Sequence, residues 1–530
     1  MSFLLEVRNL AVSYGRHPKA TTVVRDASFL VETGKITALM GETGSGKSTI
    51  GKSILQLLGT DGRILAGEIL LQGEEVSKMP EKIFASRRGR VIATIPQNPY
   101  LALDPVMRCG KQVEEIFLLE KKFRKSQVRE KVISLFTDVK LDDPERIYRS
   151  YPHMASIGEL QRVCVAMAIA ASPKLLIADE PFSSVDSINR LLLADLFWQV
   201  ASERDIGILL ITHKIELVDK LADRWYLLHH GKIVESGVGG FSSAALSNPY
   251  AQKVAADHAA MKSVNKISNP PDETLFELVD LSVTFSTKTF LGLRKQDSKA
   301  AINRLSFKVN SRETLGIVGR SGSGKSTLAK VMGGLLTTYD GNAFFRSNEI
   351  NRWVQSNRRS YYSQVQYLMQ DAGASLPPRR KTGNIIVDTL NAFHPSSGSQ
   401  QHDKALELLA SVELGQHFFG KRRDELSGGE QQRVSIARAL AAQPAALILD
   451  ESLNSLDKPV QRQIIDLLRS LQSQYELTII LISHDLSLIS HFCNRTVVLN
   501  QGEIAEIGAT FDVVNSPLAS ITKDLIRAQG

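Results

Sequence analysis

Two glycine-rich segments of nearly identical sequence carry the clearest chemistry in this chain, GETGSGKST at 41–49 and GRSGSGKST at 319–327. Each follows an apolar run and precedes a helical stretch. The glycines of such a loop let backbone N–H groups surround nucleotide phosphates, the lysine reaches the β- and γ-phosphates, and the next serine can bind Mg²⁺. The predicted phosphate-binding residues are Gly41, Glu42, Thr43, Gly44, Ser45, Gly46, Lys47, Ser48, Thr49, Gly319, Arg320, Ser321, Gly322, Ser323, Gly324, Lys325, Ser326 and Thr327.

An Asp-Glu pair ends a later apolar run in both halves, in LLIADEP (175–181) and ALILDES (446–452). The aspartate is predicted to hold Mg²⁺, directly or through water, and the glutamate to orient and polarise the attacking water. An isolated acidic pair is more often a turn or a helix cap, but a phosphate loop lies upstream of both pairs. The predicted Mg²⁺ ligands are Ser48, Asp179, Ser326 and Asp450, and the predicted catalytic glutamates are Glu180 and Glu451.

These landmarks belong to an internal repeat. The glycine-rich segments are 278 residues apart, because the second copy carries extra residues before its loop, at TKTFLGLRKQ. The landmarks occur in the same order in both halves, at a nearly constant offset, which indicates a tandem duplication. A polar segment at 256–272, which contains Pro270-Pro271, predicts a linker, so the domains are expected at 1–255 and 273–530. The pairs that lie 271 residues apart include Asp179 and Asp450, Ser156 and Ser427, His213 and His484, and Tyr14 and Phe285.

The elements that must position these residues are predicted from apolar patterning. KITALM, KLLIAD and GILLIT in the first copy, and ETLGIVG, AALILD and TIILIS in the second, are short and continuously apolar. Such runs suit strands of a parallel sheet that is buried on both faces. Segments such as INRLLLADLFWQVASER between them are typical of amphipathic helices. Each copy is therefore predicted to be an α/β domain with a parallel sheet.

The segment LSGGEQQR (426–433) places a serine and two glycines at the start of a helical stretch. A hydroxyl and free N–H groups at a helix start can bind an anion, although the same pattern also caps helices. Because it follows a phosphate loop and Ser427 lies 23 residues before Asp450, the segment resembles the signature motif of ABC-transporter ATPases. ASIGELQR (155–162) lies at the same distance from Asp179, with Ile157 in place of a glycine of the family motif. A β-branched residue there is expected to be strained or held away from a phosphate.

The resemblance covers nearly the whole chain and implies two tandem P-loop ABC ATPase domains. Each would have a parallel-sheet core, an antiparallel β part and a helical subdomain. SSVD (183–186) and NSLD (454–457) match the D-loops. The further site residues that it implies are Gln97 and Gln370 of the Q-loops, also as Mg²⁺ ligands; His213 and His484, to hydrogen-bond the γ-phosphate; Tyr14 and Phe285, to stack on adenine; and Ser156, Gly158, Ser427, Gly428 and Gly429 of the signatures.

Finer segments resemble one branch of the family, the dipeptide, oligopeptide and nickel importers. IPQNPYLALDPVM and LMQDAGASLPPR match a stretch of that branch, although Ala372 and Ser452 replace prolines that are usual in the family. The resemblance implies a fused pair of ATP-binding subunits that enclose two ATP molecules head-to-tail and energise import of peptides, nickel or a related metal chelate. Chains of this branch often carry a cysteine-rich tail for an iron–sulfur cluster; no such tail is present, so no cluster is predicted.

Composition bounds the partners. The chain has 530 residues, three cysteines and a formal net charge of +8, which is mild for its length and gives no support for a nucleic acid partner. No apolar run reaches about 18 residues, so no membrane-spanning helix is expected, and the first residues do not predict a signal peptide. The expected partners are ATP with Mg²⁺, two transmembrane permease subunits and a solute-binding protein. The expected location is peripheral, on the cytoplasmic face of the bacterial inner membrane.

Three other functions remain open at this stage. A soluble ABC ATPase that acts on ribosomes or DNA lacks support, because neither a long charged helix between the copies nor a set of zinc cysteines is present. A regulatory module that binds nucleotide without turnover is suggested only by Ile157. An exporter is also open. The cargo is not predicted, because the ATPase does not touch it.

Overall fold

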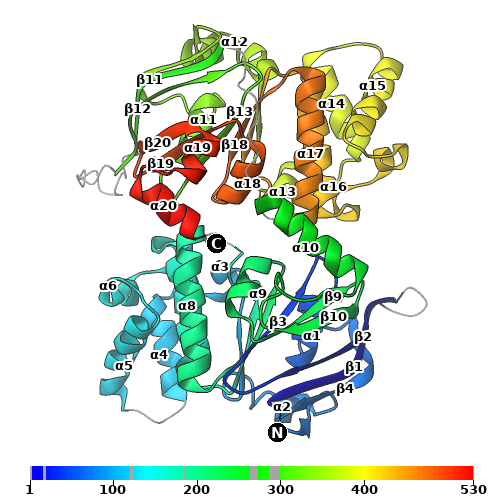
Figure 1. The fold of residues 1–530 in the computed structure, drawn as a ribbon, viewed down its shortest axis with the longest axis vertical. Coiled ribbons are helices and arrows are strands. Elements are labelled where there is room, and N and C mark those ends of the chain that lie inside the picture. Colours follow the sequence, from blue (N-terminus) through cyan, green and yellow to red (C-terminus); the bar gives the residue numbers. More distant parts are fainter. Residues whose placement is uncertain are drawn as a thin grey trace. The chain divides into compact units, whose positions relative to one another are not determined.

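A computed structural model describes residues 3–15, 20–119, 124–183, 185–262, 273–285, 299–454, 456 and 458–528. The chain divides into two compact units, Met1–Ala256 and Asp257–Gly530 (Figure 1). Each unit is described by itself below. The extra residues predicted before the second phosphate loop, 287–296, lie outside the described residues.

The first unit is built on a sheet with strand order β5-β4-β1-β2-β10-β9-β3-β8-β7-β6. Strands β6, β7, β8, β3 and β9 pair in parallel, whereas β1, β2, β4 and β5 form antiparallel pairs. The strands are β1 (Leu5–Tyr14), β2 (Thr21–Val31), β3 (Ile36–Gly41), β4 (Gly62–Leu71), β5 (Glu74–Glu75), β6 (Ile92–Ile95), β7 (Leu175–Asp179), β8 (Gly207–Thr212), β9 (Arg224–His229) and β10 (Lys232–Val238).

Helices α4, α5 and α6 of the first unit gather to one side of the sheet, next to α8 (Figure 1). One apolar cluster joins these helices to the sheet, and it includes Val113, Val132, Val163 and Leu176. The helices are α1 (Lys47–Ile54), α2 (Glu81–Phe84), α3 (Pro99–Ala102), α4 (Cys109–Leu119), α5 (Lys125–Asp138), α6 (Pro144–Arg149), η1 (Pro152–Met154), α7 (Ile157–Ala170), α8 (Ser187–Arg204), α9 (Ile215–Leu221) and α10 (Pro249–Lys262).

The second unit repeats this architecture with two separate sheets. An antiparallel sheet has the order β12-β11-β14-β15, and a second sheet has the order β16-β17-β18-β13-β19-β20, in which only β20 is antiparallel to its neighbour. The strands are β11 (Thr274–Phe285), β12 (Lys299–Asn310), β13 (Thr314–Gly319), β14 (Asp340–Phe345), β15 (Asn348–Glu349), β16 (Val365–Leu368), β17 (Ala446–Asp450), β18 (Thr478–Ile482), β19 (Arg495–Asn500) and β20 (Glu503–Ala509).

The helices of the second unit follow the same order around its sheets, with α14, α15 and α16 as its helical part (Figure 1). They are α11 (Lys325–Met332), α12 (Ile350–Gln364), α13 (Ala372–Ser375), α14 (Thr382–Phe393), α15 (Gly398–Ser411), η2 (Gln416–Gly420), η3 (Arg423–Glu425), α16 (Gly428–Leu440), α17 (Lys458–Tyr475), α18 (Leu486–Phe492), α19 (Thr510–Asn515) and α20 (Ser520–Arg527).

The predicted fold class is confirmed in both units. Strands β3, β8, β13 and β18 are buried along their whole length, as expected for strands covered on both faces. The predicted linker differs in one respect, because its first residues, 256–262, continue helix α10, and its remainder lies outside the described residues. Within the described part of the chain, none of the helices has the length and apolarity needed to cross a membrane.

Candidate active sites

The first phosphate loop joins the end of β3 to the start of α1. Gly46, at the N-cap of α1, has φ 110°, a conformation that L side chains rarely adopt. A Cβ on Gly41 would lie 2.2 Å from the carbonyl oxygen of Leu228, so a side chain does not fit where β3 meets the loop. Gly324 and Gly319 occupy the same situations in the second unit, with φ 101° and a clash of 2.2 Å with the Leu499 carbonyl. Both loops therefore depend on glycine for their shape.

The loop lysines are nearly buried and bend back over their own loops. Lys47 Nζ donates to the carbonyl oxygens of Gly41 at 2.7 Å and Glu42 at 2.8 Å. Lys325 Nζ donates to those of Gly319 and Arg320, at 2.9 Å and 3.0 Å. These bonds hold each ammonium group beside its loop. The N–H groups of the loop lie at a helix N-terminus, which is a favourable place to bind phosphate.

Each loop also contains a buried hydroxyl that lacks a hydrogen bond. Ser45 Oγ and Ser323 Oγ are both buried without a hydrogen-bond partner. A buried hydroxyl without a partner costs free energy, so its presence indicates a ligand group that it would meet. A phosphate oxygen in the loop would accept this bond. The residues present therefore fit a bound nucleotide.

Four of the six predicted Mg²⁺ ligands meet in pairs at the carboxyl ends of β7 and β17; of the other two, Gln370 contacts Glu451 and Gln97 lies exposed in its loop. Ser48 Oγ donates to Asp179 Oδ1 at 3.0 Å, and Ser326 Oγ donates to Asp450 Oδ1 at 3.0 Å. Hydroxyl and carboxylate oxygens are the donors that Mg²⁺ prefers, so both pairs suit it. Burial raises the pKa of Asp179 above its usual value, and the hydrogen bond from Ser48 offsets part of that rise.

The predicted catalytic glutamate of the first unit contacts the predicted switch histidine. Glu180 has φ 47°, and its Oε1 lies 2.7 Å from His213 Nδ1 in a hydrogen bond. Burial works to raise the pKa of Glu180, but the nearby His213 and Lys47 outweigh it and lower the pKa below its usual value. The carboxylate is thus kept ionised, as a group that accepts a proton from water must be.

The corresponding glutamate of the second unit has different partners. Glu451 has φ 51°, but its Oε2 lies 4.0 Å from His484 Nδ1, beyond hydrogen-bonding distance. His484 Nδ1 instead lies 3.0 Å from Asn454 Nδ2, and Asn454 Oδ1 accepts from Ser483 Oγ at 2.7 Å. Gln370, of the predicted Q-loop, donates from Nε2 to Glu451 Oε2 at 3.2 Å. Side chains of the same type in the two units therefore form different hydrogen bonds.

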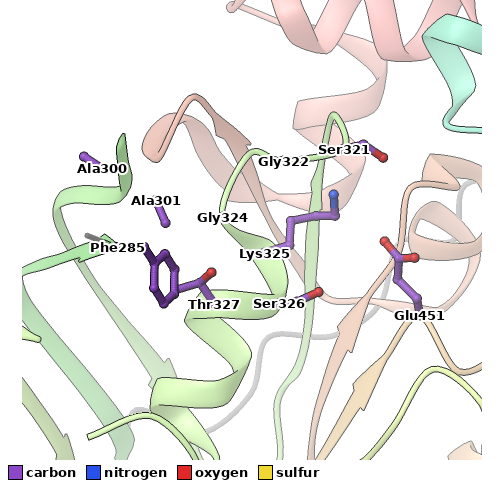
Figure 2. Close-up of a pocket in the computed structure, with 10 residues that line it drawn as sticks. All are labelled: Phe285, Ala300, Ala301, Ser321, Gly322, Gly324, Lys325, Ser326, Thr327 and Glu451. Carbon is purple, nitrogen blue, oxygen red and sulfur yellow. The ribbon is translucent and has the colours of Figure 1, made fainter. Parts of the chain in front are cut away.

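The second loop lines a pocket of about 560 Å³. Figure 2 shows Phe285 at one end, Lys325 and Ser326 in the middle, and Glu451 at the other end. Phe285 is 52% exposed, so its ring is accessible for stacking on a base. Tyr14 ends β1 as Phe285 ends β11, so it holds the equivalent place in the first unit. Ala300 and Ala301 also line this pocket, and the sequence analysis did not single them out.

The signature serines begin helices α7 and α16. Ser156 and Ser427 are N-caps that form capping boxes with Glu159 and Glu430, so the helix-cap interpretation of these serines is also satisfied. The strain predicted for Ile157 is wrong, because neither Ile157 nor its counterpart Gly428 has a positive φ; both are the first helical residues after the cap. The side chain of Ile157 is 38% exposed. Ile157 therefore differs from Gly428 by carrying a partly exposed side chain at the start of the helix, and not by a positive φ.

Gln97 lies exposed in the loop that follows β6, and Gly158 and Gly429 lie in the first turns of α7 and α16. Ser184 and Ser455, together with Asp457 of the predicted D-loops, lie outside the described residues. A further residue, not predicted from the motifs, is Tyr367, whose hydroxyl donates to Asp450 Oδ2 at 2.5 Å. Its only sequence signal is its position, three residues before Gln370.

A parallel sheet, a glycine loop that opens a helix, and an Asp-Glu pair at the end of a neighbouring strand define an ATP-binding P-loop domain, and this chain contains the arrangement twice. A family model described as ABC transporter matches residues 24–183 and 302–454. The chain belongs to the ABC transporter family. The predicted class, an ABC ATPase with two tandem ATPase domains, is confirmed.

Similar proteins extend over the full chain. An uncharacterized ABC transporter ATP-binding protein YejF of Escherichia coli is 34% identical and covers 99% of both chains. A peptidoglycan transport ATP-binding protein YejF of Agrobacterium fabrum is 32% identical over 99% of this chain and 96% of its own. A glutathione import ATP-binding protein GsiA of Pectobacterium atrosepticum is 30% identical over 99% of this chain and 89% of its own.

Proposed function

We propose that this chain is the ATP-hydrolysing subunit of an ABC importer for peptides or other peptide-containing solutes. The observation that carries the proposal is that both units combine a phosphate loop with an adjacent serine–aspartate pair and a glutamate. Import of this cargo class is supported by relatives named for glutathione import and peptidoglycan transport, which align along nearly the whole chain. Nickel or another metal chelate is the alternative cargo.

In this proposal, the loop N–H groups and the ammonium groups of Lys47 and Lys325 bind the phosphates of ATP. Mg²⁺ would be held by Ser48 with Asp179, and by Ser326 with Asp450, and its charge would stabilise the transferred phosphoryl group. Gln97 and Gln370 are proposed to extend toward the same phosphates. Tyr14 and Phe285 would stack on adenine.

Glu180 and Glu451 are proposed to orient the attacking water and accept its proton. His213 would fix the Glu180 carboxylate through its hydrogen bond and present its other ring nitrogen to the γ-phosphate. Ser156, Gly158, Ser427, Gly428 and Gly429 are proposed to bring a second set of donors to the nucleotide through the starts of helices α7 and α16.

A groove of about 610 Å³ in the first unit suggests where a permease docks. It lies between the end of the sheet at β6 and helices α4 and α7, and Pro96, which precedes Gln97, forms part of its lining. Leu57 and Leu119 line it and are 51% and 71% exposed. Exposed apolar side chains around a groove are typical of a protein-binding site. We propose that an apolar segment of a permease binds here, which would connect the membrane partner to the Gln97 loop.

The complete complex would contain two permease subunits and a solute-binding protein, with this chain on the cytoplasmic face of the bacterial inner membrane. The deciding experiment reconstitutes the chain in lipid vesicles together with its permease subunits. ATP is supplied on the side of the membrane where this chain lies, and labelled peptide and solute-binding protein are supplied on the other side. We expect the peptide to accumulate on the ATP side. The Lys47→Ala, Lys325→Ala double variant is the control. ATP hydrolysis without transport, or transport in the opposite direction, contradicts the proposal.

A further inference from the structure

Tyr367 is the one tyrosine among the described residues whose hydroxyl reaches a proposed Mg²⁺-binding carboxylate. Its hydroxyl donates to Asp450 Oδ2 at 2.5 Å, while Ser326 Oγ donates to Asp450 Oδ1 at 3.0 Å. Both oxygens of this carboxylate are therefore held. Hydrogen bonds from O–H to an ionised carboxylate are short and roughly twice as strong as neutral ones, so the contact fixes the plane of the carboxylate.

The position of the tyrosine follows from the sheet. Tyr367 is in β16, where it pairs with Ile448 of β17, and Asp450 ends β17 two residues later. Two strand residues span about 7 Å, which is the reach of a tyrosine side chain that leans along the strand. A tyrosine hydroxyl carries its proton at neutral pH, so it acts as the donor in this contact.

The second unit makes room for the ring. A Cβ on Gly333, just after α11, would lie 3.1 Å from Cδ2 of Tyr367, closer than an ordinary contact. In the first unit Leu55 stands at the position of Gly333 and Thr94 at that of Tyr367, counted from the loop lysines and the Q-loop glutamines. The first unit thus has the larger residue at the first position and the smaller at the second, and the second unit has the reverse. The tyrosine and its space occur together, which indicates a built feature of the second unit.

The first unit has no equivalent support. Within the described residues, the Asp179 side chain accepts a hydrogen bond only from Ser48, at Oδ1. Among the described residues, its other oxygen has no donor that corresponds to Tyr367. The two aspartates therefore differ in how firmly they are oriented, although the surrounding sequence motifs are alike.

We propose that Tyr367 is a positioning residue of the second nucleotide site, whose hydroxyl orients the Asp450 carboxylate for Mg²⁺. This inference rests on the proposed function of that site. A group that orients a metal ligand typically contributes about 10–100-fold to metal affinity. The second site is accordingly expected to bind Mg²⁺ at lower concentrations than the first.

The test uses the full-length chain with Lys47→Ala, so that nucleotide binds only at the second loop. Binding of a non-hydrolysable ATP analogue is measured calorimetrically, first with EDTA and then across a titration of free Mg²⁺. We expect Tyr367→Phe to leave metal-free binding unchanged and to raise the half-saturating Mg²⁺ concentration about 10–100-fold. Because only the hydroxyl is removed, the ring continues to fill its space beside Gly333.

The matched control is Tyr362→Phe, because the hydroxyl of Tyr362 donates to the backbone carbonyl of Gly334 at 3.2 Å and not to Asp450. It should leave the Mg²⁺ titration unchanged. Three results overturn the inference. The half-saturating Mg²⁺ concentration is unchanged in Tyr367→Phe, or analogue binding in EDTA weakens as much as binding with Mg²⁺, or Tyr362→Phe raises the half-saturating Mg²⁺ concentration by the same factor. Failure of the proposed function would give a different result. The Lys47→Ala chain would then show no nucleotide binding that depends on the second loop, so adding Lys325→Ala would change nothing.

Discussion

We expect Glu180→Gln to remove most of the ATPase activity of this chain and Glu451→Gln to leave most of it. Glu180 Oε1 lies 2.7 Å from His213 Nδ1, whereas Glu451 Oε2 lies 4.0 Å from His484 Nδ1. Only the first distance permits a hydrogen bond. The carboxylate of the first unit is therefore hydrogen-bonded to its histidine, whereas the Glu451 and His484 side chains are separated by the longer distance of an ion pair.

The size of the effect follows from that contact. A hydrogen bond to a charged group contributes about 1.5–3 kcal/mol, or a factor of about 10–100 in rate if it acts on the transition state. ATP hydrolysis at the site that contains Glu451 is then slower by at least about tenfold, so this site supplies about a tenth of the total turnover or less. Glutamine at either position removes a general base that contributes about 10²–10⁴-fold at its own site.

The assay is steady-state ATPase activity in the complex with the permeases. The two Glu→Gln variants serve as controls for each other, because each exchanges one carboxylate for an amide at equivalent positions. Calorimetry must show that both variants still bind ATP. Equal losses of activity, or a larger loss from Glu451→Gln, would refute the reasoning from the histidine contacts.

Three further outcomes are expected. Lys47→Ala combined with Lys325→Ala should abolish both of two ATP-binding events per chain in calorimetry, and two undiminished sites would contradict the assignment of the loops. Ile157→Gly should raise ATPase activity, because it uncovers the N–H groups at the start of α7; unchanged or lower activity would show that the side chain does not obstruct them. Burial raises the pKa of the Cys109 thiol to about 11 and that of Cys164 to about 12. Because the thiolate is the reactive form, iodoacetamide should label neither at neutral pH until urea unfolds the chain, and labelling of the folded chain would contradict this.

The features that sequence alone predicts are local or continuous along the chain. The phosphate loop at 41–49 depends on the glycines that the backbone needs at the junction of β3 and α1, so a few adjacent letters specify it. The buried strands β8 and β18 are short apolar runs, and a run of that kind in an α/β pattern indicates a parallel sheet. The offset between the repeats then predicts which residues of the second copy correspond to the site residues of the first.

Contacts between side chains from separate segments of the chain were decided only by the tertiary structure. Asn454 and Tyr367 come from segments whose sequences give no indication that they reach His484 and Asp450. Likewise, the sequence predicts that Ile157 is strained or held away from a phosphate, but its backbone is helical behind the cap of α7. Motif letters specify residue types at positions, whereas hydrogen bonds depend on distances of a few ångströms between strands, which packing sets separately in each unit.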